Sequence, residues 1–141
     1  MITPRASAAF ILTLFLLSPL RAETNAYSAV RSASDFAIGG VGVAGVMTRE
    51  ELAMREIRDS AQAGEQLRKL LREATPAGQM YALFALRQLN STDYVALSAP
   101  YRQSSTIVPT ISGCIVHTQR MSETVRWIDQ WAKKIRTWEK P

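Results

Sequence analysis

The sequence predicts an α+β fold that is mostly helical, with antiparallel helical hairpins, a small two- or three-stranded sheet and a C-terminal amphipathic helix. Three observations predict this fold. Apolar residues recur every three or four positions between residues 48 and 89. β-Branched residues gather among Ser, Thr, Pro and Gly in residues 104–117. One apolar stripe, bordered by tryptophans, runs along residues 121–140.

Residues 1–22 are typical of a secretory signal peptide. Arg5 precedes an apolar run over residues 8–17, and Pro19 is followed by the small residue Ala22, after which we expect cleavage. A membrane span needs about 20 apolar residues, and Pro19 ends this run too early. We therefore expect an exported protein, either periplasmic or extracellular.

The composition predicts one small globular domain over residues 23–141. The full chain has 141 residues, of which 47% are hydrophobic and 21% are charged, and a chain of this composition is globular rather than disordered. Beyond the leader, 119 residues carry 15 basic and 12 acidic side chains. This small basic excess, with no platform of aromatic side chains, disfavours nucleic acid as a partner.

The first part of that domain lacks helical periodicity. Residues 23–35 are polar without a sustained period, and we expect a mobile or loosely helical lead-in. Residues 36–47 predict a glycine-interrupted strand or a close-packed loop. Within them, residues 40–45 match the G-x-G-x-x-G pattern of dinucleotide-binding proteins. The next helix begins only at Thr48, too late to face a pyrophosphate, so we expect no nucleotide cofactor.

Thr48 and Glu51 form a predicted capping box, in which each side chain satisfies a backbone donor at the start of a helix that ends near Asp59. A second helix is predicted over residues 61–73. The acidic residues of both helices alternate with arginines, which indicates a solvated face with ion pairs rather than a carboxylate pair for acid–base chemistry. Examples of these acidic residues are Glu50, Glu51, Glu56 and Glu65.

Thr75 and Pro76 mark the clearest helix start in the sequence, because Thr is a favoured N-cap and Pro at the first position loses no hydrogen bond. The helix that follows is apolar on nearly every side, which predicts that it is the most buried helix. Thr92 then caps a short predicted helix over residues 93–99, which Pro100 ends.

Residues 104–117 predict one or two strands with a turn, and residues 36–47 are the expected pairing partner. Cys114, the sole cysteine, is expected to be a small buried hydrophobe; an intermolecular or reactive thiol is the alternative. On a strand, His117 and Cys114 would lie on opposite faces. One His and one Cys are also too few for a zinc site, so we expect neither a catalytic pair nor a metal here.

The helix predicted over residues 121–140 carries the candidate interaction surface. Trp127, Trp131, Lys134 and Trp138 lie along one edge of it or beside that edge, and tryptophans next to cations suit a partner groove or a lipid headgroup boundary. The competing interpretation is a terminal helix that docks its apolar face on the core and keeps its charges in solvent.

Two stretches resemble an uncharacterised family of small exported bacterial proteins: Ala-Thr-Pro-Ala-Gly-Gln-Met-Tyr-Ala-Leu at residues 74–83 and Ser-Gly-Cys-Ile-Val at residues 112–116. Residues 36–45 add a weaker third stretch. The resemblance implies a bacterial, periplasmic source and carries no activity, because the shared residues are packing residues.

These features together predict an exported interaction module that binds another envelope protein or a ligand and has no catalytic activity. The alternative is a peripheral membrane protein that contacts lipid through its basic, Trp-bearing C-terminal helix. An enzyme that uses Cys114 is a third possibility, because a fold can assemble a site without a linear motif. The sequence leaves open whether residues 36–45 line a pocket.

Overall fold

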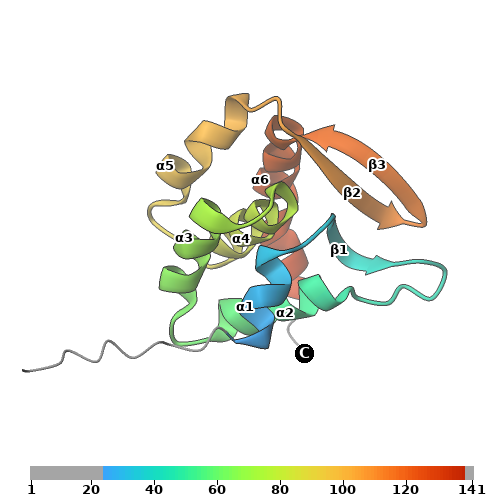
Figure 1. Ribbon diagram of the computed structural model, residues 1–141, viewed down its shortest axis with the longest axis horizontal. Helices are drawn as coiled ribbons and strands as arrows, with labels where there is room; N and C mark the ends of the chain where they lie inside the picture. Colours follow the sequence, from blue (N-terminus) through green and yellow to red (C-terminus); the bar gives the residue numbers. More distant parts are fainter. Residues whose placement is uncertain (1–23, 139–141) are drawn as a thin grey trace, which may run out of the picture.

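The computed structural model describes residues 24–138, apart from the side chain of Trp138, and confirms the predicted α+β class with a small three-stranded sheet (Figure 1). The elements follow the predicted order. They are α1 (Asn25–Arg31), β1 (Phe36–Val41), α2 (Arg49–Asp59), α3 (Ala63–Glu73), α4 (Pro76–Gln88), α5 (Tyr94–Ser98), the 3-10 helix η1 (Ala99–Gln103), β2 (Ile107–Gly113), β3 (Ile115–Arg120) and α6 (Met121–Trp138).

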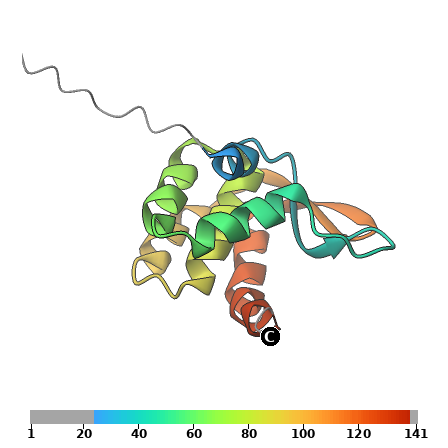
Figure 2. The same ribbon diagram turned by 90° about the horizontal axis from the view of Figure 1, so that it is seen from below.

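Helix α4 is the centre of the core, as its apolar sequence predicts. Its side chains Met80, Tyr81 and Phe84 are completely buried, and it packs against α2, α3 and α6. The predicted cap is confirmed, because the Thr75 hydroxyl accepts a hydrogen bond from the Gly78 N–H at 3.2 Å. The helices of the core therefore surround α4, with the sheet to one side (Figure 2).

Of the two alternatives predicted for residues 23–35, the helical one holds and the mobile one is wrong, because residues 25–31 form a regular, capped helix. The Thr24 side chain caps α1 by accepting from the Tyr27 N–H at 3.2 Å, and Tyr27 and Val30 are buried. Helix α1 packs closely on α2. Seven residues make only two turns, too few for the periodicity to be detected among the surrounding polar residues.

The sheet has the order β1-β2-β3, with β1 parallel to β2 and β2 antiparallel to β3. This pairing confirms the partnership predicted between the glycine segment and residues 104–117. The turn between β2 and β3 consists of Gly113 and Cys114, because Ser112 pairs with Ile115. Both views show this hairpin and the loop after β1 projecting beyond the helices (Figures 1 and 2).

Two local predictions need correction. Cys114 is exposed rather than buried, because it lies in the two-residue turn at the end of the projecting hairpin and not within a strand. Thr92 does not cap α5, because Asp93 occupies the N-cap position and no side chain makes a cap hydrogen bond. The α-helix ends before Pro100 as predicted, and the chain continues directly into η1, where the missing N–H of Pro100 in the first turn costs no hydrogen bond.

Candidate functional site

A pocket of about 210 Å³ lies where the sheet meets α6. We call it the sheet pocket. Its lining consists of two aromatic, two aliphatic and five polar residues. The lining residues are Phe36, Ile38, Thr110, Ile111, Ser112, His117, Gln119, Thr124 and Trp127.

Strand register explains why these side chains meet. Thr110 pairs with Phe36 on one side and with His117 on the other, so the three side chains share one face of the sheet. Residues two positions away on each strand join the same face, including Ile38 and Gln119. Helix α6 lies beside this face and adds Thr124 and Trp127.

The aromatic part of the sheet pocket is fixed by the core. The Trp127 ring stacks on Phe84 with ring centroids 6.0 Å apart and meets Phe36 edge-on at 6.0 Å. Phe36 in turn contacts the buried Tyr81 ring at 4.9 Å. Edge-to-face and stacked pairs of this kind hold each ring in one orientation, so the apolar wall is formed before any ligand binds.

The polar part of the sheet pocket contains an unsatisfied group. Thr110 is only 7% exposed, and its Oγ1 has no hydrogen-bond partner in the described part of the chain. Buried hydroxyl groups are nearly always paired, because leaving one unpaired costs about 1–3 kcal/mol. None of the lining residues is Asp, Glu, Lys or Arg. The sheet pocket therefore offers hydrogen bonds without a permanent charge.

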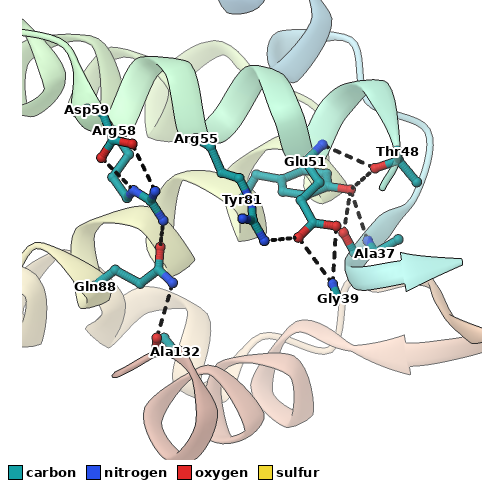
Figure 3. Close-up of polar contacts among 10 residues, drawn as sticks. All are labelled: Ala37, Gly39, Thr48, Glu51, Arg55, Arg58, Asp59, Tyr81, Gln88 and Ala132. Atoms are coloured by element: carbon teal, nitrogen blue, oxygen red, sulfur yellow. Dashed lines mark hydrogen bonds and ion pairs between the residues drawn. The ribbon is translucent and has the colours of Figure 1, made fainter. Parts of the chain in front are cut away.

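Tyr81 holds strand β1 in place from the side opposite β2. Its hydroxyl accepts a hydrogen bond from the Ala37 N–H and donates one to the Ala37 carbonyl, each at 3.0 Å (Figure 3). Phe36 and Ile38, on either side of Ala37, thereby point into the sheet pocket. Burial raises the pKa of Tyr81 to about 12, consistent with a neutral hydroxyl that both donates and accepts.

Glu51 holds the next part of β1. Its carboxylate is completely buried, accepts from the Gly39 N–H at 3.1 and 3.2 Å, and pairs with Arg55 at 2.7 Å (Figure 3). The Thr48 half of the predicted capping box is confirmed by a 3.1 Å bond from the Glu51 N–H. The prediction of a solvated Glu51 is wrong, because this side chain turns inward to bind the glycine strand.

We expect the protein to lose stability at high pH because the Tyr81 phenol is buried. An unfolded Tyr ionises near pH 10, whereas folding raises the pKa of Tyr81 to about 12. The raised pKa of Tyr81 therefore contributes fully to the free energy of unfolding below pH 10, and this contribution is lost as the pH rises from 10 toward 12. In urea unfolding at pH 8 and pH 11.5, we expect wild type to lose about 2 kcal/mol more than Tyr81→Phe. Equal losses in both proteins would contradict the assignment.

A second buried polar cluster connects α2, α4 and α6. Arg58 is 7% exposed and donates to the Gln88 amide oxygen at 2.6 Å, and the Gln88 nitrogen donates to the Ala132 carbonyl at 3.2 Å (Figure 3). Arg58 also donates two bonds to Asp59, which lower the pKa of that carboxyl. The cluster positions α6, and with it Trp127, relative to α2 and α4.

The candidate interaction residues of α6 have different surroundings. Trp127 is half-buried and lines the sheet pocket. Trp131 is 37% exposed, with the Lys134 ammonium 4.8 Å from its ring centroid. The Trp138 side chain lies outside the described residues. The helix thus brings Trp131 and Lys134 together on the surface, while Trp127 faces the sheet.

Sequence reasoning missed most of the sheet pocket. It singled out Trp127 for an exposed surface and treated His117 as structural. The alternation of Ile115, His117 and Gln119 indicates one shared strand face, and this was the available signal. The register that sets this face opposite Phe36 depends on long-range pairing.

Within residues 24–138, no group of His, Cys, Asp and Glu side chains is arranged to hold a metal ion. No helix in the same range has the length and hydropathy needed to cross a membrane. Comparison with protein-family models, curated proteins and solved structures found no match to the chain. The resemblance to a family of small exported proteins therefore stays a prediction.

Proposed function

We propose that the protein is a small exported binding module whose sheet pocket receives an uncharged group with an apolar ring and a hydrogen-bonding substituent. The signal-peptide pattern of residues 1–22 supports export. The sheet pocket supports binding, and the observation that carries the proposal is a lining that joins the Phe36 and Trp127 rings to polar residues without a permanent charge.

The chemistry of the wall selects the class of ligand. The Phe36 and Trp127 rings favour a flat apolar partner, and His117, Gln119 and Ser112 add hydrogen-bond donors and acceptors to the lining. A charged group would lose its hydration without gaining an opposite charge, which is costly. The volume of about 210 Å³ is below that of most drug-sized sites, so the bound group is a small molecule or one side chain of a partner.

Binding rather than catalysis fits the groups that are present. The sheet pocket has one imidazole and three hydroxyls, and neither a carboxylate nor a thiol lines it. Activation of a hydroxyl nucleophile needs a base that a third group orients, and no lining residue supplies that third group to His117. Cys114 lies outside the wall, in the hairpin turn.

A lipid-binding role is the second candidate, and one observation favours it. Trp131 and Lys134 are adjacent and exposed on α6, an arrangement that suits a headgroup boundary. Its test is co-sedimentation with anionic phosphatidylglycerol vesicles at low and high salt. Binding that Trp131→Ala and added salt both weaken would support this role, and no binding at low salt would remove it.

Three probes of similar shape test the charge preference of the sheet pocket. We expect uncharged benzamide to bind weakly, with Kd on the order of millimolar, and benzoate and benzamidinium to bind at least tenfold more weakly. Gln119→Ala removes a lining amide and should weaken benzamide binding about fivefold. Thr118→Ala, on the opposite face of β3, is the matched control. Equal affinities for all three probes would contradict the proposal.

A further inference from the structure

The fold covers one edge of the sheet and leaves the other open. At β1, the Tyr81 hydroxyl binds both backbone groups of Ala37, and Glu51 accepts from the Gly39 N–H. These side chains take the place of a neighbouring strand, since a residue's N–H and C=O point to the same edge. At the other edge, β3 is the last strand of the sheet, and no segment of residues 24–138 lies beside its outer side (Figure 1).

The turn geometry decides which backbone groups of β3 are open. In a two-residue hairpin, the residues that flank the turn exchange both hydrogen bonds, and here these are Ser112 and Ile115. Gly113, with φ +57°, supplies the left-handed first turn position. Alternation then directs the backbone groups of His117 toward β2 and those of Val116 and Thr118 outward.

Two further contacts agree with this alternation. Thr118 lies opposite Pro109, which has no N–H to offer a strand partner. The Arg120 N–H, next along the outer edge, already donates to the Glu123 carboxylate at 3.0 Å. In the described part of the chain, the open edge therefore consists of two N–H groups and two carbonyls, from Val116 and Thr118.

The charge pattern indicates what pairs with this edge. Exposed edge strands are usually protected by charged residues or proline, yet residues 103–119 contain no Asp, Glu, Lys or Arg and β3 contains no proline. Ile115 and Val116 are 59% and 68% exposed. Two copies of this basic chain repel one another, but residues 103–119 bring no like charges together when they pair.

We propose that β3 pairs antiparallel with β3 of a second copy, about a two-fold axis at His117. The Val116 N–H donates to the carbonyl of Thr118 of the partner subunit, and the N–H of that residue donates to the Val116 carbonyl. The two-fold axis repeats these two bonds, and the resulting four bonds satisfy all four open groups of each chain. The result is a continuous six-stranded sheet in which both sheet pockets lie on the same face, one on each side of the axis.

Sedimentation velocity and a spin label test this pairing. We expect a reversible dimer that Thr118→Pro, which lacks the outward N–H, weakens at least tenfold, while Thr118→Val has no effect. If Thr118→Pro fails to fold, Val116→Lys serves instead, because it brings cations together near the axis and its effect should diminish with added salt.

The label is placed on Cys114, the sole cysteine, which the structure exposes at the hairpin turn. In the proposed register the two Cys114 positions are six residues apart along the strands, so pulsed electron spin resonance should give an interspin distance on the order of 20–30 Å. A wild-type chain that stays monomeric at high protein concentration would overturn the proposal. A dimer with an interspin distance outside this range would also overturn it. So would a dimer that Thr118→Pro and Val116→Lys both leave intact. We expect the monomer to bind benzamide whether or not the dimer forms, so this test is independent of the proposed function.

Discussion

A Gly78→Ala variant is expected to lose about 3 kcal/mol of its free energy of unfolding, because α1 and α4 leave no room for a methyl group. A Cβ at this position would lie 2.3 Å from the Val30 carbonyl oxygen and 2.9 Å from the Ala74 Cβ. Both contacts are far inside van der Waals distance, and the nearer one is with backbone. Relief would require α1 to move away from α4, which would open the core around Val30.

Gly64→Ala is the matched control for that variant. This glycine lies in α3, and a Cβ there would meet only the end of the Arg68 side chain, at 3.0 Å. That guanidinium is 43% exposed, pairs with Asp93 at 2.8 Å and needs to give way by only a few tenths of an ångström, so Ala should gain helix propensity and raise stability by up to about 1 kcal/mol. Urea unfolding measures both variants. Equal losses at the two positions would show that the α1–α4 contact is not the cause.

Glu51→Ala is expected to cost about 2–4 kcal/mol and to loosen the glycine strand. The change removes the acceptor of the Gly39 N–H and the ion-pair partner of Arg55, whose side chain is 19% exposed. Loss of one partner from a buried pair is strongly destabilising, and access of water to Arg55 reduces the cost toward the lower figure. Glu51→Gln, which keeps an acceptor oxygen, should lose less than Glu51→Ala.

The control for Glu51 is Glu56→Ala, an exposed carboxylate on the same helix. We expect this change to alter stability by less than about 0.5 kcal/mol. Hydrogen exchange at the Gly39 amide gives a second measurement, since it should accelerate in Glu51→Ala and stay at the wild-type rate in Glu56→Ala. Unchanged protection of Gly39 in Glu51→Ala would contradict the role given to this carboxylate.

The parts of the fold that depend on local chemistry could be predicted from the sequence. The caps at Thr48 and Thr75 act within three residues, and both are present. The burial of α4 on nearly every side could be predicted from the apolar residues of that helix alone. The pairing of residues 36–47 with residues 104–117 followed from their shared β character.

The parts that depend on long-range packing could not be predicted. The burial of Glu51 is set by a glycine strand that approaches α2, whereas its neighbours in sequence indicate a solvated helix face. The exposure of Cys114 follows from a register that puts it in a turn. The sheet pocket needs three strands and α6 in one arrangement, and no single segment carries that information.

A backbone amide chemical-shift map recorded during a benzamide titration is the most direct measurement of whether the sheet pocket is a binding site. We predict that the largest shifts cluster at Thr110, Ser112, His117 and Gln119, together with the indole N–H of Trp127. Shifts that cluster elsewhere, or a Trp127 indole that does not respond at saturating benzamide, would contradict a binding role for the sheet pocket.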